Sequence, residues 1–211
     1  MNRNRICAPV RAIVILLCVG LLFGTGCRRE SAETIPSNWP EYAMSGIRFR
    51  LEPGWSAVEP EDWEETLGKA LSDASLGYDA ADDFQWVGML ASPDLSTKTR
   101  DYLVAAYISF PGEITETVLQ EQLEQMKDLK LQFVQAGTTA SMLSDPQMRE
   151  WGGRSVIAFT IRMNLSDDTR TVIQVGLVPH GTRLYVFHYV DEGAEQSNGN
   201  LRKVFESLNW I

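Results

Sequence analysis

The last third of the chain contains three consecutive β-rich runs, and this pattern limits the fold more than any other feature of the sequence. Residues 154–165, 169–179 and 182–190 are rich in Val, Ile, Thr, Phe and Tyr, which favour strands. The breaks between them, 166–168 and 180–181, are short. Short connections join antiparallel neighbours, because a parallel pair needs a crossover of a dozen residues or more. The sequence therefore predicts an antiparallel meander.

Two amphipathic helices are predicted beside this meander. Residues 115–134 and a segment near the C-terminus each place apolar side chains at helical spacing, which is typical of a helix packed on a sheet. The stripe residues are Leu119, Leu123 and Met126 in the first helix and Leu201, Val204, Phe205 and Leu208 in the second. Residues 47–51, 84–91 and 102–110 are predicted strands, and 60–70 a further helix.

The arrangement of these segments resembles a known family. The entry segment Gly46–Trp55 (GIRFRLEPGW), the long central helix, the meander and the closing Leu201–Leu208 (LRKVFESL) are together similar to the PsbP-like fold, which includes DcrB-like bacterial lipoproteins. The resemblance implies an α+β domain over 46–211, with an antiparallel sheet of about six strands flanked by helices in an α-β-α sandwich. It implies no activity, because one fold hosts many functions.

The N-terminus has the pattern of an export signal. Three arginines precede an apolar run at 12–23, which has the length of a signal-peptide core and is too short for a membrane span. The small residues that follow, up to Cys27, resemble the lipobox of bacterial lipoproteins, although Gly24 stands where the family has Leu. Residues 1–26 are therefore predicted to be a lipoprotein signal peptide. An ordinary signal peptide and an uncleaved anchor are the alternatives.

Cys27 is the predicted lipidation site. The only other cysteines, Cys7 and Cys18, lie in the leader, so the mature chain cannot form an internal disulfide. Residues 27–45 are predicted to be the lipidated cysteine and a flexible tether. We expect a lipoprotein at the cell envelope that faces the periplasm or exterior and contacts the membrane through its N-terminal lipid.

The charge of the chain disfavours nucleic acid as a partner. Removal of residues 1–26 takes away three arginines and no acidic residue, so the formal net charge of -9 becomes -12. Phosphate backbones require a basic face, whereas acidic side chains outnumber basic ones in this chain.

No catalytic or metal-binding residue is predicted from the sequence. His180 is expected in a turn and His188 in a strand, where a half-buried histidine with satisfied hydrogen bonds is more common than a general base. No G-x-S-x-G, H-E-x-x-H or C-x-x-C pattern occurs. The acidic residues Asp79, Asp82 and Asp83 lack the spacing of a calcium loop and are interpreted as solvated surface. No cofactor is expected.

Six tryptophans remain as candidates for recognition, because tryptophan is favoured at interaction surfaces. Trp55 and Trp86 are expected in the core, and Trp39 and Trp151 on an exposed interaction surface. The leading hypothesis is a non-catalytic binding domain, an accessory or assembly partner of a protein complex at the envelope. A small-ligand or metal-ion carrier is the first alternative, and a hydrolase with an unrecognised site is the second.

Overall fold

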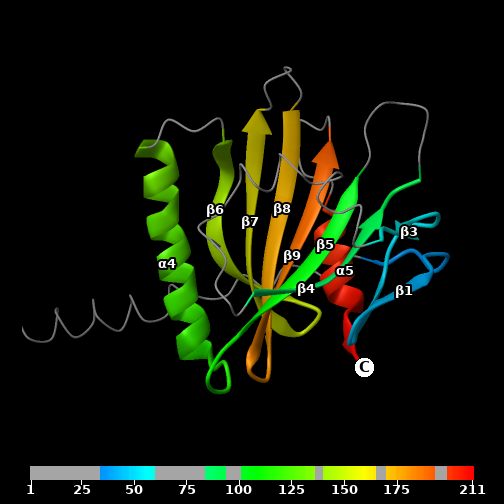
Figure 1. Cartoon of the computed structure of the whole chain (residues 1–211), viewed down its shortest axis with the longest axis horizontal. Helices are drawn as coiled ribbons and strands as arrows, with labels where there is room; N and C mark the ends of the chain where they lie inside the picture. The colour runs from blue at the N-terminus through cyan, green and yellow to red at the C-terminus, as the bar shows by residue number, and fades with distance from the viewer. Residues whose placement is uncertain (1–33, 60–83, 94–100, 136–139, 165–169, 193–198) are drawn as a thin grey trace, which may run out of the picture.

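The computed structural model describes residues 34–59, 84–93, 101–135, 140–164, 170–192 and 199–211. The described elements form two sheets and two helices (Figure 1). The strands are β1 (Glu41–Met44), β2 (Ile47–Arg50), β3 (Ser56–Ala57), β4 (Phe84–Ala91), β5 (Tyr102–Ser109), β6 (Ala140–Trp151), β7 (Arg154–Asn164), β8 (Arg170–His180), β9 (Arg183–Glu192) and β10 (Asn209–Trp210). The helices are α4 (Glu116–Gln135) and α5 (Asn200–Ser207).

The large sheet is antiparallel throughout and has the strand order β3-β4-β5-β9-β8-β7-β6. The predicted meander is its second half, since β7, β8 and β9 are neighbours in chain order. Strand β5 joins β9 from the Tyr102 and Val190 pair to the Ser109 and Arg183 pair. Strand β5, which the sequence predicted to be central, therefore lies inside the sheet and links the meander to β4.

Each face of the large sheet carries its own apolar core. Along β9, Leu184, Val186 and Val190 lie in the core that includes the buried stripe of α4, whereas Tyr185 and Phe187 lie in the core that includes α5. This alternation is the side-chain period of a strand. The sheet is thus covered by α4 on one face and by α5 on the other, an α-β-α arrangement (Figure 1).

The small sheet packs beside α5 and completes the second core. Its order is β1-β2-β10, and β2 alternates buried Ile47 and Phe49 with exposed Arg48 and Arg50. The Ser207 hydroxyl at the end of α5 accepts a hydrogen bond of 2.8 Å from the backbone N–H of Arg50. The small sheet and α5 are therefore joined both by apolar burial and by a direct hydrogen bond.

Helix α5 lies very close to the large sheet because β8 has a glycine beneath it. A Cβ built on Gly176 would lie 2.7 Å from Cε2 of Phe205, a distance that real Cβ atoms do not show. The four residues of the predicted C-terminal stripe, from Leu201 to Leu208, are all buried. The absence of a side chain at Gly176 therefore sets how deeply α5 is seated.

Strand β6 forms one edge of the large sheet and is irregular. Its pairing with β7 shifts register twice between Met142 and Gln147, and Pro146 lies within this stretch. Proline and bulges are typical of edge strands, where they discourage pairing with another chain. Irregularity at this position is consistent with an exposed edge.

The α+β fold class is confirmed, and so are the described helices and strands that the sequence predicted. The sheet has seven strands and a second sheet has three, rather than one sheet of about six. Strand β1 precedes Gly46, where the domain was predicted to begin, and pairs with β2. The helix expected at 60–70 and the leader lie outside the described residues. Within the described ranges, no helix is long and apolar enough to span a bilayer.

Candidate functional site

Three chain reversals and the C-terminus meet at one end of the large sheet, which we call the turn end (Figure 1, lower end). The backbone N–H groups of Phe110 and Ile114, after β5, donate to the carbonyls of Thr182 (2.7 Å) and Gly181 (2.9 Å) in the β8–β9 turn. The β6–β7 turn lies at this end as well. The N–H of Ile211 donates to the carbonyl of Gly46 at 3.0 Å, which holds the C-terminus there.

An aromatic row crosses the turn end on the face of the sheet that carries α5. The imidazole of His180 stacks on Trp210 with ring centroids 4.1 Å apart and an interplanar angle of 13°. Trp210 lies 4.8 Å from Tyr185, which lies 5.5 Å from Tyr107. The guanidinium of Arg183 covers Tyr107 at 4.4 Å. The row is therefore an ordered cluster of rings built from β5, β8, β9 and β10.

Two large apolar side chains are exposed at this end within the described part of the chain. Ile211 follows Trp210 and is 66% exposed, and Trp86 is 47% exposed. Gln85, whose side-chain oxygen accepts a hydrogen bond from the Tyr107 hydroxyl, faces the row, whereas its neighbour Trp86 is paired with Ala106 and faces the opposite side of the sheet. What we call the turn-end surface therefore consists of Tyr107, His180, Trp210 and Ile211.

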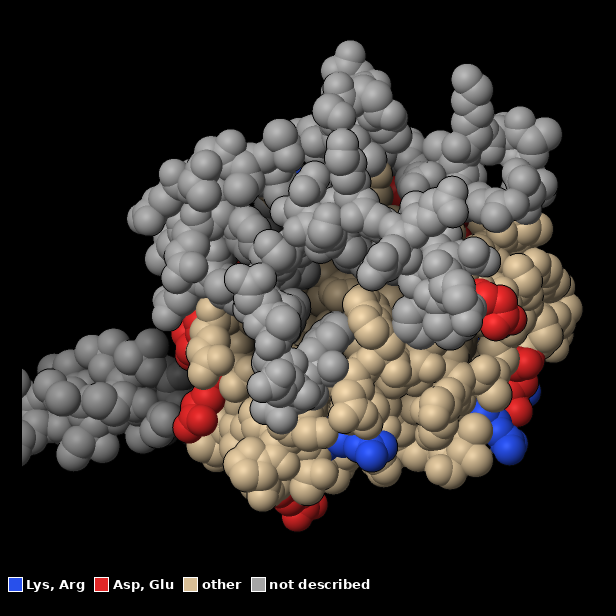
Figure 2. Space-filling view, in the orientation of Figure 1, with Lys and Arg blue, Asp and Glu red and all other residues tan. Residues whose placement is uncertain are grey.

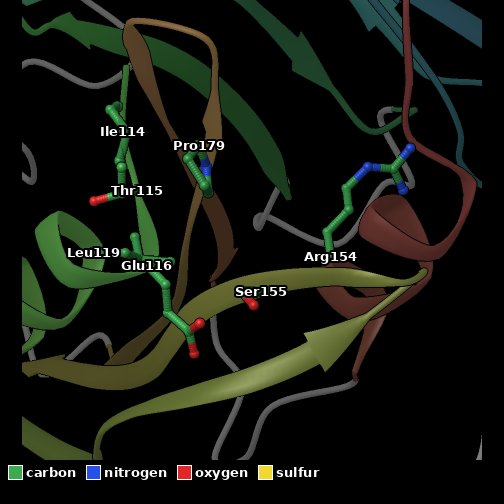
Figure 3. Close-up of a pocket in the computed structure, with 7 residues that line it drawn as sticks. All are labelled: Ile114, Thr115, Glu116, Leu119, Arg154, Ser155 and Pro179. Carbon is green, nitrogen blue, oxygen red and sulfur yellow. The ribbon is translucent and has the colours of Figure 1, made fainter. Parts of the chain in front are cut away.

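A small cavity lies next to this surface, on the face that carries α4. Its volume is about 290 Å³, and it is lined by Ile114, Thr115, Glu116, Leu119, Arg154, Ser155 and Pro179 (Figure 3). The guanidinium of Arg154 points away from the other lining residues (Figure 3). It donates instead to the carbonyls of Leu208 at 2.6 Å and Gly152 at 3.1 Å. Arg154 therefore caps the end of α5, and its positive charge is not directed into the cavity.

His188 lies in an apolar environment and lacks the partners of a catalytic histidine. It is buried in the middle of β9, between Val104 of β5 and Val175 of β8. Neither ring nitrogen has a hydrogen-bond partner, and burial lowers the pKa of His188 to about 4. The expectation of a satisfied, half-buried histidine was wrong. A hydrolase that uses His188 needs a nucleophile within hydrogen-bond reach of it, and within the described part of the chain neither ring nitrogen makes a hydrogen bond.

The opposite end of the large sheet, which we call the tether end, carries a polar network. Asn200 donates to Glu52 Oε1 at 2.7 Å and to the hydroxyl of Tyr189 at 3.0 Å. Tyr189 donates to Asp101 Oδ2 at 3.3 Å. Burial, together with the nearby carboxylates of Asp101 and Glu52, raises the pKa of Asp191 to about 6. Several acidic groups therefore share a partly buried space at this end.

The tryptophans are not placed as the sequence predicted. Trp39, expected on the surface, is buried, with the Lys203 ammonium 5.2 Å from its ring centroid. Trp151 is half-buried and packs edge-on against Phe205 at 5.6 Å. Trp86, expected in the core, is exposed, whereas Trp55 is buried as expected. Exposure is therefore corrected for Trp39, Trp151 and Trp86.

The remaining predicted site residues are not placed. Cys27 and the acidic loop of Asp79, Asp82 and Asp83 lie outside the described residues. Among the described residues, no group of three or more His, Cys, Asp or Glu side chains has the geometry to hold a metal ion. Charged side chains of both signs lie around the margin of the described surface in Figure 2, with uncharged side chains between them.

Sequence reasoning missed the turn-end surface. His180 was interpreted as an unremarkable turn residue, and Trp210 was not singled out. Their stacking depends on β10 pairing with β2, in the register that sets Trp210 opposite Ile47. Two features of the sequence could have indicated this surface: the aromatic residues of the β8–β9 hairpin and the C-terminal Asn-Trp-Ile. Both lie at the turn end once the meander is folded.

Neither a protein-family model nor a curated protein sequence matches this chain. Three solved structures are similar to it. The solution structure of PsbP from the cyanobacterium Synechocystis sp. PCC 6803 has 13% identity and a TM-score of 0.49, covering 88% of this chain and 100% of that protein. A Bacteroides thetaiotaomicron protein has 8% identity and a TM-score of 0.47, covering 79% of this chain and 46% of that protein, so this chain spans less than half its length.

The third structure is LpqN, described as involved in cell envelope biogenesis of Mycobacterium tuberculosis. It has 8% identity and a TM-score of 0.37, and the alignment covers 61% of this chain and 78% of LpqN. At such identities the likeness concerns the arrangement of helices and strands and does not extend to function. A PsbP protein is thus among the solved structures to which this chain is similar.

Proposed function

We propose that this chain is an envelope lipoprotein, held at a membrane by lipid on Cys27, whose domain binds a protein partner without catalysing a reaction. The observation that most supports binding is the turn-end surface. It combines the exposed side chain of Ile211 with an ordered row of aromatic rings. Apolar surface with aromatic anchors is typical of protein–protein interfaces.

The position of this surface also suits an anchored protein. The chain enters the fold at the tether end, where the N–H of Leu51 donates to the carbonyl of Pro40 and Glu52 contacts Asn200. Eleven residues separate Cys27 from Trp39, and an extended chain of that length reaches at most about 40 Å. The tether end would then face the membrane, and the turn end would face away from it toward a partner.

The alternative functions have less support. A drug-sized ligand generally occupies a cavity of about 300–1,000 Å³ with converging polar groups. The cavity at α4 is at the bottom of that range, and its one cation, Arg154, is directed at α5. His188, which a carrier or hydrolase would use, is buried among apolar side chains. These observations favour a binding surface over a ligand cavity or a hydrolytic site.

Replacing the predicted lipidation site, Cys27→Ser, should abolish the lipid modification and leave a soluble or an unprocessed protein. The reason is that a serine hydroxyl does not accept the lipid that would hold the cleaved chain at the membrane. The measurement is membrane fractionation with intact-mass analysis, in which wild type should carry the lipid mass. Gly24→Leu is the matched control, because it restores the lipobox consensus and should leave the protein lipidated. Unchanged mass and membrane association of Cys27→Ser would contradict the proposal.

The turn-end surface should contact the partner directly. A photo-crosslinking residue placed at Ile211 should form an adduct with one protein in native membranes, whereas the same residue at the exposed Glu121 of α4 should not. The variant Ile211→Asp should weaken that complex about tenfold or more, as expected when an apolar anchor is removed. Its unfolding midpoint should stay close to that of wild type. An adduct equally strong from Glu121 would show that the contact is not specific to this surface.

A further inference from the structure

An exposed arginine, Arg183, lies beside the turn-end surface. It is the first residue of β9, where it is paired with His180 of β8 and with Ser109 of β5. Tyr185 follows two positions later on the same strand, so the two side chains share one face of the sheet. The Cζ atom of Arg183 lies 4.4 Å from the centroid of the Tyr107 ring. Arg183 therefore adds a positive charge to the aromatic row.

The ring on which Arg183 stacks is itself held by its neighbours. The Tyr107 hydroxyl donates a hydrogen bond to the side-chain oxygen of Gln85. The Tyr107 ring packs at 5.5 Å against Tyr185, which is buried. A guanidinium that already lies over a fixed ring has less conformational freedom to lose when it binds than a side chain that is free in solvent. Arg183 is therefore preorganised for binding.

Among the described residues, no carboxylate forms an ion pair with Arg183. Two other arginines have partners within the chain, since Arg48 pairs with Glu41 at 3.6 Å and Arg154 donates to carbonyls at the end of α5. Glu113 lies in the segment that is hydrogen-bonded to the β8–β9 turn, but it does not pair with Arg183 either. The charge of Arg183 is therefore available to an acidic group of another molecule.

A stacked guanidinium and an exposed apolar side chain recognise complementary parts of one segment. Stacking occupies a face of the guanidinium and leaves the N–H groups at its edge, which match the two oxygens of a carboxylate. Trp210 stacks on His180, the residue paired with Arg183 across the hairpin. Ile211, next to Trp210, is 66% exposed. The cation and the apolar side chains are thus close enough to contact neighbouring residues of one partner segment.

We propose that Arg183 binds an aspartate or glutamate side chain of the protein partner, beside an apolar residue of the partner that packs on Trp210 and Ile211. This inference rests on the proposed function, because it names the chemistry of the partner at the same surface. Charge complementarity supports it. Acidic side chains outnumber basic ones in this chain, so an acidic segment is repelled by most of the domain and attracted at a cation that has no internal partner. Arg183 would therefore determine where the segment docks.

The first test measures how the adduct formed from a photo-crosslinking residue at Ile211 depends on Arg183. In native membranes, at expression levels below saturation, Arg183→Gln should lower the adduct yield about tenfold, as expected when a charge-assisted hydrogen bond is lost. Arg183→Lys should lower it less, because it keeps the charge but not the planar fork. Arg50→Gln is the matched control, since Arg50 is exposed on β2 and its replacement should leave the yield unchanged.

The second test detects the partner carboxylate directly. A water-soluble carbodiimide activates carboxylates, which then form an amide with an amine in direct contact, whereas a guanidinium does not react. In Arg183→Lys, the amine introduced at position 183 should couple to an aspartate or glutamate of the protein that the Ile211 adduct captures. Mass spectrometry of the linked peptides identifies both ends. Wild type should give no link at position 183, and Arg50→Lys should give none to that protein.

The outcomes separate this inference from the proposed function. The inference is overturned if Arg183→Gln leaves the Ile211 adduct unchanged. It is also overturned if the amine at position 183 couples only to acidic residues of this chain, such as Glu113 of the same molecule or of a second copy. In either case the Ile211 adduct itself would still support a partner at the turn-end surface. Absence of that adduct in wild type would contradict the proposed function and the inference together.

Discussion

The substitution Phe205→Ala is expected to lower the free energy of unfolding by about 3–5 kcal/mol, the usual cost of removing a buried aromatic ring. Phe205 is fully buried. Its ring packs against Phe187 at 5.0 Å and Trp151 at 5.6 Å, and it covers Gly176. Truncation should therefore leave a cavity beside Leu201, whose Cδ2 also lies over Gly176. Urea denaturation followed by far-UV circular dichroism at neutral pH measures the loss, and Phe205→Leu should lose less.

A double variant tests the packing geometry behind this prediction. Gly176→Ala alone should destabilise the fold by about 1–3 kcal/mol, because its Cβ would lie 2.7 Å from the Phe205 ring. In the Phe205→Ala background that ring is gone, so the added methyl should be tolerated. The loss in the double variant should then be smaller than the sum of the two single losses. Strict additivity would show that Phe205 does not close over Gly176.

The parts of the fold that the sequence predicted correctly are those encoded by local pattern. The meander has alternating or continuous apolar runs with short breaks, and its strands β7, β8 and β9 agree with the predicted ranges to within about two residues. Helix α5 carries four apolar residues at helical spacing, and all four are buried. Such patterns need no knowledge of distant contacts, because the period alone decides which face is covered.

The parts that were missed depend on tertiary context. Strand β6 contains Pro146 and two register shifts, so its sequence lacks the regular alternation of a strand. Strands β3 and β10 are only two residues long and exist because a neighbouring strand is present. Trp86 appeared suited to the core, yet β3 pairs only with Leu90 and Ala91 of β4. The opposite end of β4 therefore leaves Trp86 exposed.

The polar network of the tether end had no local signal. Tyr189 donates to Asp101, and Asn200 bridges Tyr189 to Glu52. These residues are up to about 150 positions apart in the chain, and their meeting is fixed by the order of β5 and β9 in the sheet. Periodicity reports which face a side chain occupies, but not which distant side chain will share that face.

His188 is expected to make the fold sensitive to acid. Its pKa is lowered by burial to about 4 from the usual 6.5. Between these two pH values the unfolded chain is protonated at His188, whereas the folded protein is not. The stability is fully present above pH 6.5 and is lost as pH falls toward 4. The difference of about 2.5 pKa units corresponds to about 3 kcal/mol. His188→Leu should remove this loss, as measured by urea denaturation at pH 7 and pH 4.

The comparison needs a background in which residue 191 does not titrate. The raised pKa of Asp191 makes its contribution run in the opposite sense, since stability from that group grows as pH falls through about 6. Both variants should therefore be measured with Asp191→Asn present. His180→Gln is the matched control, because His180 is exposed at the turn end and its replacement should leave the acid sensitivity in place. At pH 7 the leucine variant should be no less stable than the parent, since it removes two buried nitrogens that have no hydrogen-bond partner. An unchanged acid loss in His188→Leu would show that the folded protein admits a proton to this core.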